Sequence, residues 1–282
     1  MNFKPLVRRL ILSTIVLVVL VSILFFIFIV PYRTLPILMY HSIQSAERKD
    51  DNLTLAKYIF KRQMKFLSRN NYRVASLREV IKMIKKGKNI PKDWVVITFD
   101  DGYRDFYNQA YPILREHKFN ATVFVTIDYL WNNKNCLSWD QVEQLAKDDL
   151  IDIGSHSLYH SKLVLLSVSQ AEKEILLSKL ILEKRLKKTI MFFSYPFGAT
   201  NDSIKGLVKK AGFEAAVGTA YQRGEFRNDD IYILRRIFVS RVSQYPFVFK
   251  FMLSGYYVPT RELFLRVLNI KTPRDIYIVT NR

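Results

Sequence analysis

The chain has 282 residues, of which 49% are hydrophobic and 14% aromatic, so it can hold a membrane segment plus one well-packed domain and is too apolar to be mainly disordered. Its net charge of +19 suits anionic surfaces or polymers. The sequence has no recognisable nucleic-acid module, so we expect no nucleic-acid partner and a solvated basic face beside a membrane. The single cysteine, Cys136, excludes an internal disulfide and a thiolate metal cluster.

The first predicted element is an apolar helix over residues 10–30. About 20 apolar residues at a rise of 1.5 Å each span a hydrocarbon core of roughly 30 Å. A cleavable signal peptide is the alternative, but its apolar core is usually about 7–15 residues long and precedes a small-residue cleavage site, which this run lacks. Three basic residues precede the run and only Arg33 follows it closely. The positive-inside rule therefore predicts that residues 1–33 form a cytoplasmic N-terminus and an uncleaved single-pass anchor, with the rest extracytoplasmic.

Beyond this segment, short apolar runs alternate with stretches that carry apolar residues at helical spacing. Capping boxes mark three helix starts: Ser76 with Glu79, Ser138 with Gln141, and Ser169 with Glu172. The strand–helix alternation predicts an α/β fold, a distorted (β/α) barrel of about seven strands with its active site at the C-terminal strand ends. The seven predicted strands are residues 36–40, 94–99, 121–126, 150–155, 190–195, 213–218 and 232–239.

The domain limits follow from the same pattern. Residues 34–240 hold all seven predicted strands and are expected to form the catalytic barrel domain. Residues 245–253 are strongly apolar but too short to span a bilayer. We therefore expect residues 241–282 to be a C-terminal extension that packs either on the barrel or on the membrane.

Two motifs suited to metal chemistry stand directly after predicted strands. TFDDG occupies residues 98–102, and HSLYH occupies residues 156–160. Neighbouring aspartates normally diverge on a strand, but at a glycine turn both can border one cavity, one as a metal ligand and the other as a general base. An ordinary turn and two loop histidines without function are the alternatives for each motif taken alone.

The histidines strengthen the prediction of a hydrolytic metal site. Of the four in the chain, His41, His156 and His160 lie at the ends of predicted strands, whereas His117 lies at a polar helix end and is expected on the surface. The spacing of His156 and His160 resembles the zinc-protease helix, but Ser157 stands where that motif needs its glutamate base. The joint placement favours a divalent metal held by aspartate and histidine in a hydrolase.

A third motif, SYPFG at residues 194–198, follows another predicted strand. Its proline and glycine predict a turn that can expose backbone N–H groups to a cavity, as an oxyanion hole requires. An ordinary turn that ends the strand is the alternative.

In this order, the three motifs resemble those of the polysaccharide deacetylases (carbohydrate esterase family four, the NodB-homology domain) over about residues 35–239. The resemblance implies a distorted α/β barrel that removes N-acetyl groups from polymers of N-acetylated sugars, with one divalent metal ion, expected to be zinc. Carried over to this chain, it implies that Asp101, His156 and His160 are the metal ligands. It also implies the remaining machinery: Asp100 as the general base and the N–H of Phe197 as an oxyanion donor.

Two departures from the common family pattern bear on the site. Ser194 stands where many members carry an arginine that orients the catalytic aspartate, and no histidine follows His160 to serve as the late acid. The early LMYH, which ends at His41, looks like that acid element moved to the N-terminus. This arrangement is similar to the subgroup that deacetylates poly-N-acetylglucosamine, so we assign the acid to His41. From its position on the last strand, Arg236 is a candidate for the missing cation near Asp100.

Aromatic side chains near the motifs are candidates for stacking on sugar rings. These are Tyr103, Trp131, Trp139 and Tyr159, with core packing as the alternative for about half of them. Tyr103, Trp139 and Tyr159, together with Arg236, are taken as the substrate-binding residues. Two functional alternatives stay open: a membrane-tethered glycan-binding protein without turnover, and a deacetylase of peptidoglycan or of a lipid-linked sugar.

Overall fold

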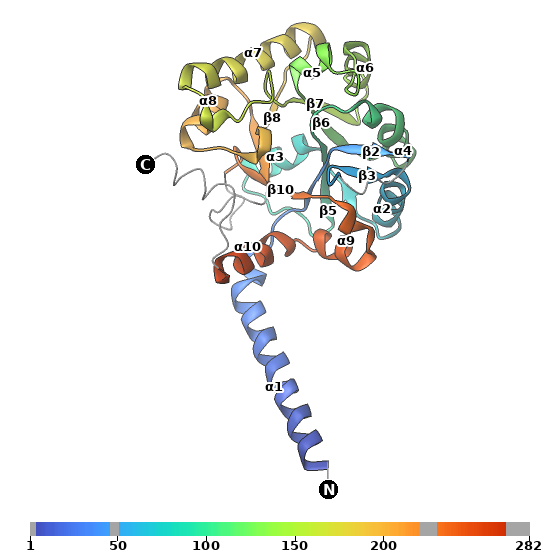
Figure 1. Ribbon diagram of the computed structural model, residues 1–282, viewed down its shortest axis with the longest axis vertical. Helices are drawn as coiled ribbons and strands as arrows, with labels where there is room; N and C mark the ends of the chain where they lie inside the picture. Colours follow the sequence, from blue (N-terminus) through green and yellow to red (C-terminus); the bar gives the residue numbers. More distant parts are fainter. Residues whose placement is uncertain (1–3, 46–50, 220–229, 269–282) are drawn as a thin grey trace.

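The computed structural model describes residues 4–45, 51–219 and 230–268. The chain begins with α1 (Lys4–Phe28), which projects away from the rest of the molecule (Figure 1) and leads into η1 (Val30–Tyr32). Residues Val7–Tyr32 are long and apolar enough to cross a membrane, and none of the most apolar window is buried inside the structure. The predicted N-terminal helix of membrane-spanning length is therefore present.

Seven parallel strands close into a barrel, as predicted. The hydrogen-bonded order is β1-β10-β9-β8-β7-β6-β5, and β5 pairs again with β1 to complete the ring. Each of the seven predicted runs supplies one of these strands: β1 (Ile37–Tyr40), β5 (Trp94–Phe99), β6 (Ala121–Val125), β7 (Ile151–Ser155), β8 (Phe192–Ser194), β9 (Ala215–Thr219) and β10 (Leu234–Phe238).

Three short strands were not predicted from the sequence. β2 (Ser42–Gln44) and β3 (Thr54–Ala56) form a two-stranded parallel sheet, and β4 (Arg73–Val74) pairs with the start of β5. Segments of two or three residues are too short to show the alternation of apolar and polar residues that identifies a strand.

Helices surround the barrel (Figure 1). In chain order they are α2 (Lys57–Arg69), α3 (Leu77–Lys85), η2 (Phe106–Ala110), α4 (Tyr111–His117), α5 (Ile127–Asn132), α6 (Trp139–Leu145), η3 (Leu163–Leu165), α7 (Val168–Leu186), η4 (Pro196–Gly198), α8 (Asp202–Lys210), η5 (Arg241–Gln244), α9 (Pro246–Leu253) and α10 (Tyr257–Val267).

Two of the three predicted capping boxes are present, at Ser76 and at Ser138. The third prediction is wrong, because α7 is capped by Ser167, whose side chain accepts from the backbone N–H of Gln170. Ser169 lies inside the first turn of the helix. Serines stand at both positions, and the extended backbone at Ser167 decides which one forms the cap.

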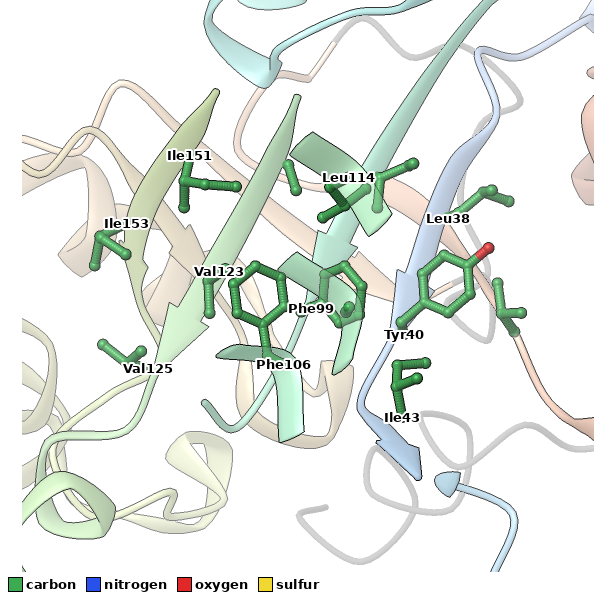
Figure 2. Packing of buried hydrophobic residues seen from close by; sticks show 14 of the residues in the cluster. Leu38, Tyr40, Ile43, Phe99, Phe106, Leu114, Val123, Val125, Ile151 and Ile153 are labelled. Carbon is green, nitrogen blue, oxygen red and sulfur yellow. The ribbon is translucent and has the colours of Figure 1, made fainter. Parts of the chain in front are cut away.

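Successive side chains along the strands belong alternately to two hydrophobic clusters. On β5, Val95, Ile97 and Phe99 belong to the larger cluster, which packs between the strands and the surrounding helices (Figure 2). Trp94 and Val96 point the other way, into a smaller cluster that draws on six barrel strands and fills the barrel interior. The next positions on the interior side of β5 are Thr98 and Asp100. The alternation of side chains along β5 therefore places polar groups inside the barrel at its C-terminal end.

The C-terminal helices α9 and α10 lie beside the point where α1 meets the domain (Figure 1). Phe249, Met252 and Leu253 of α9 are buried in the larger cluster. Glu262 of α10 forms a buried ion pair with Arg235 of β10. In the described part of the extension, these helices thus pack on the barrel; residues 269–282 of the predicted extension lie outside the described residues.

Candidate metal centre and active site

The candidate residues gather at one rim of the barrel. Asp100 and Asp101 follow β5, His41 follows β1, and His156 follows β7. These strands are parallel, so their C-terminal ends meet at the same rim, which is where barrel enzymes place their active sites.

A sharp turn after β5 keeps both aspartates at this rim. Asp100 is buried and still continues the strand, with its N–H donating to the carbonyl of Tyr40 at 3.0 Å. Asp101 and Gly102 then both adopt the left-handed region, with φ of 67° and 68°. Glycine suits the second position because it has no Cβ, and a Cβ there would lie 3.0 Å from Val125. The turn lets two neighbouring carboxylates serve one site.

Asp101, His156 and His160 converge on one point. The Nε2 atom of His156 lies 3.4 Å, and that of His160 lies 3.2 Å, from Oδ1 of Asp101. The three potential ligand atoms lie within 4.8 Å of one another. The structure thus brings together the three residues predicted as metal ligands. A carboxylate oxygen and two imidazole nitrogens are a donor set that suits zinc and similar divalent ions in hydrolases.

The surroundings of these ligands fit a cation. Oδ1 of Asp101 is buried, and among the described residues it has no hydrogen-bond partner, an arrangement that is costly for a carboxylate unless a cation faces it. Nδ1 of His156 lies 2.8 Å from the carbonyl oxygen of Ser194, so it can donate there and leave Nε2 to ligate. Burial opposes the charged form of both groups, but their neighbours outweigh it. Asp100 and then Asp101 raise the pKa of His156, and His156 and His160 lower the pKa of Asp101.

The carboxylate of Asp100 is held by Arg236, which reaches it from β10. Both pairs, Nη1 with Oδ1 and Nη2 with Oδ2, lie at 2.6 Å, so the contact is bidentate. Arg236 also donates from Nε to the carbonyl of Gly218 at 3.0 Å and from Nη2 to the hydroxyl of Ser194 at 2.9 Å. Burial alone would raise the pKa of Asp100, but Arg236 and His156 lower it below its usual value. Asp100 is therefore ionised at neutral pH, as a general base must be.

Arg236 was predicted in two roles, and the structure distinguishes them. Its proximity to Asp100 agrees with the expected cation, which stands in for an arginine at the position of Ser194. Its side chain is 0% exposed, so it offers no surface to a substrate, and the substrate-binding role is corrected. The guanidinium instead pairs with Asp100 and orients its carboxylate. The hydroxyl of Ser194 adds a longer contact of 3.3 Å to Asp100.

His41 is partly buried at the same rim. Its ring packs edge-on against Phe238 at 5.6 Å, and in the described part of the chain its Nδ1 has no hydrogen-bond partner. Burial lowers the pKa of His41, and the carboxylates of Asp100 and Asp101 partly offset this effect. The predicted acid therefore lies within electrostatic reach of the predicted base and of a predicted ligand.

The turn of η4 places Phe197 beside His160, a candidate metal ligand. Its backbone has φ of 58° and ψ of 8°, which is unusual for a residue with a side chain. The ring lies 4.6 Å from the ring of His160. No carbonyl of the described residues accepts the N–H of Phe197. Within the described part of the chain, this strained turn thus has a backbone N–H without a carbonyl partner, on a residue whose ring contacts a candidate metal ligand; an oxyanion donor needs such an N–H.

The four aromatic candidates fall into different environments. Tyr159 and Trp131 are 60% and 56% exposed and are open to a ligand. Trp139 is partly buried, 5.8 Å from Trp131 and against the larger core cluster, in line with the core alternative. Tyr103 lines a polar cavity of about 520 Å³ together with Asp105, and burial raises its pKa.

Two residues of the site were not predicted from the sequence. The ring of Tyr129 stacks on that of His160, with centroids 5.8 Å apart. Glu174 of α7 accepts hydrogen bonds from the loop that carries the candidate ligands His156 and His160. The sequence signal for Glu174 is weak: it is an acidic residue on the face of α7 that is buried at Ala171 and Ile175.

A parallel α/β barrel whose rim carries an Asp-His-His centre, a second ionised aspartate and a backbone donor defines a hydrolase with a site suited to a divalent metal. The family model for polysaccharide deacetylase matches residues 87–216. The protein YxkH of Bacillus subtilis, named after the same family, is 34% identical over 206 residues, which cover 73% of this chain and 71% of that protein. The chain belongs to the polysaccharide deacetylase family and is by class a polysaccharide N-deacetylase.

Further relatives agree with this assignment. The poly-beta-1,6-N-acetyl-D-glucosamine N-deacetylase of Staphylococcus epidermidis is 30% identical over 211 residues, which cover 71% of this chain and 72% of that protein. The structure of the Streptococcus pyogenes deacetylase PplD in complex with acetate superposes with a TM-score of 0.67 at 27% identity, covering 73% of this chain and 92% of that one.

Proposed function

We propose that this enzyme removes N-acetyl groups from an extracytoplasmic polymer of N-acetylglucosamine. The observation that carries the proposal is the convergence of Asp101, His156 and His160 at a rim that also holds Asp100 and His41. The choice of polymer is supported by the similarity to the staphylococcal deacetylase and by the position of the histidine acid before the aspartate pair.

In this proposal Asp101, His156 and His160 hold one divalent ion, expected to be zinc. Such an ion supplies Lewis acidity: it polarises a carbonyl and can lower the pKa of a water from 15.7 toward about 7. A buried carboxylate oxygen without a hydrogen-bond partner and a histidine whose Nδ1 is engaged by a carbonyl both support this role for the three side chains.

The other residues move or hold protons and charge. Asp100, ionised and fixed by Arg236, takes the proton of the attacking water. The N–H of Phe197 donates to the oxygen of the acetyl carbonyl as negative charge develops on it. His41, in its imidazolium form, gives a proton to the sugar nitrogen as the C–N bond breaks. Burial lowers the pKa of His41, which favours release of this proton. The products are acetate and a free amino sugar.

Acetate release from a panel of glycans tests this proposal. The full chain, purified in detergent with zinc, is incubated with poly-β-1,6-N-acetylglucosamine, chitin oligomers and peptidoglycan. We expect acetate from poly-β-1,6-N-acetylglucosamine first. Faster release from peptidoglycan would favour the alternative substrate class, and binding of glycans without any acetate would favour a glycan-binding protein without turnover.

We further propose that α1 anchors the chain with its N-terminus in the cytoplasm and the barrel outside. The apolar length of α1 and the basic residues before it support this orientation. Phe247 and Tyr245 of the adjoining C-terminal segment are 73% and 52% exposed and suit contact with the membrane surface. A Lys134→Cys variant should react with a membrane-impermeant maleimide in intact cells, because Lys134 is exposed and the native Cys136 is buried. Labelling only after cell lysis would contradict the orientation.

A further inference from the structure

We propose that Glu174 of α7 is a positioning residue that fixes the ligand loop, residues 156–160, and thereby sets the affinity of the metal centre. The inference depends on the proposed metal site and extends it to a residue outside the ligand set. Glu174 lies fourteen residues beyond the last ligand, His160, and on a different element.

The carboxylate of Glu174 accepts three hydrogen bonds from this part of the chain. Its Oε2 accepts the N–H of Leu158 at 3.0 Å and the N–H of Tyr159 at 2.9 Å. Its Oε1 accepts the hydroxyl of Ser161 at 2.7 Å. Glu174 is only 6% exposed, and no lysine or arginine of the described residues pairs with it. A buried carboxylate is costly unless its oxygens are satisfied, so its attachment to the loop is strongly favoured.

The opposite edge of the ligand loop is held by the start of α5. The N–H of Asp128 donates to the carbonyl of Leu158 at 2.9 Å, and the N–H of Ile127 donates to the carbonyl of Ser157 at 3.3 Å. The loop carbonyls therefore bond to α5 and the loop N–H groups bond to Glu174. With both edges held, the backbone between the two ligand histidines has one arrangement available.

The loop needs such support because its backbone is strained. Ser157 and His160 adopt φ of 67° and 58°, and the loop contains no glycine to relieve either position. Residues with a Cβ persist in this region only where surrounding contacts over-determine them. His160 is itself a ligand, so any relaxation of its backbone would move its imidazole away from Asp101.

Four full-chain proteins test the proposal: wild type, Glu174→Ala, Glu174→Gln and the control Glu172→Ala. Glu172 lies on the same helix but pairs with Lys210 on the surface and does not contact the loop. The zinc Kd is measured by competition with a chelating dye, and the absorption spectrum of the cobalt-loaded protein reports ligand geometry. Melting of the metal-free proteins measures the purely structural effect.

We expect Glu174→Ala to weaken zinc binding by about 10- to 100-fold and to change the cobalt spectrum. Glu174→Gln should stay close to wild type, because its amide oxygen can accept both N–H groups and its NH₂ can donate to Ser161. Glu172→Ala should bind zinc as wild type does. If Glu174→Ala does not fold, Glu174→Asp, whose carboxylate is one methylene too short, should show the weakened binding instead.

Wild-type zinc affinity and cobalt spectrum in Glu174→Ala, or in Glu174→Asp, would overturn the inference, even with a lowered melting temperature. A wild-type chain that binds no zinc would instead overturn the proposed metal site, so the two failures are distinguishable.

Discussion

Replacing Arg236 is the perturbation with the best-defined consequences. Its guanidinium makes two 2.6 Å contacts to Asp100 and has no exposed surface, so its removal leaves a carboxylate buried without its main counter-charge. Breaking a buried pair by removing one partner costs about 3–5 kcal/mol of unfolding free energy. We expect Arg236→Met, which fills the space without charge, to lie in this range, and Arg236→Lys to lose less because it keeps the charge but not the fork geometry.

The catalytic effect of the same change has a definite sign. Arg236 lowers the pKa of Asp100, and Asp100 must be ionised to act as a base. Without Arg236 the pKa of Asp100 rises, so the acidic limb of the kcat/KM profile moves to higher pH. Loss of the fixed orientation of the Asp100 carboxylate should by itself lower kcat by about 10²-fold at the pH optimum, since a misplacement of a catalytic group by about 1 Å costs this much.

The assay combines urea unfolding of the metal-free proteins with acetate release from pH 5 to pH 9 for wild type, Arg236→Lys and Arg236→Met. The double variant Asp100→Asn/Arg236→Met should be less destabilised than the sum of the single changes, because the two residues are directly coupled. An unchanged acidic limb together with a kcat within twofold of wild type in Arg236→Met would refute the positioning role.

Three further predictions concern the same rim. Asp100→Asn should keep metal and lose nearly all activity, whereas His156→Ala should lose both; metal analysis and acetate release decide, and full activity in either variant would contradict the roles. His41→Gln should lower kcat by about 10²- to 10⁴-fold with unchanged zinc affinity. An unaltered kcat would show that His41 is not the general acid. The pKa of His156 is raised, so its proton must leave before Nε2 can ligate, and zinc affinity should rise with pH until that pKa is passed. Calorimetry in two buffers measures the released proton, and a pH-independent affinity would contradict this coupling.

The barrel was predictable because its strands carry strong local signals. Each of the seven apolar runs predicted as a strand supplies one strand of the ring, since a strand buried on both faces must be almost wholly apolar. The failures lie where local signals are weak. β2, β3 and β4 are too short to show a period, and Ser167 and Ser169 compete for one helix start with equally good chemistry.

The gathering of the candidate metal ligands was predictable for a topological reason. The C-terminal ends of parallel strands lie at one rim, so Asp101 and His156 were expected at the same rim once the barrel was assumed. The supporting residues depend on distant parts of the chain. Arg236 is separated from Asp100 by 136 positions, and only its place on the interior side of the last strand suggested the contact. The sequence marks Glu174 only as an acidic residue on the buried face of a helix, which does not indicate what it contacts.

Removal and return of the metal tests the central claim most directly. The purified full chain is stripped with chelator, dialysed and assayed for acetate release from poly-β-1,6-N-acetylglucosamine before and after zinc is added back. The account predicts that activity disappears with the metal and returns as one zinc per chain binds, but not in His156→Ala. Undiminished acetate release by the metal-free wild-type protein would contradict it.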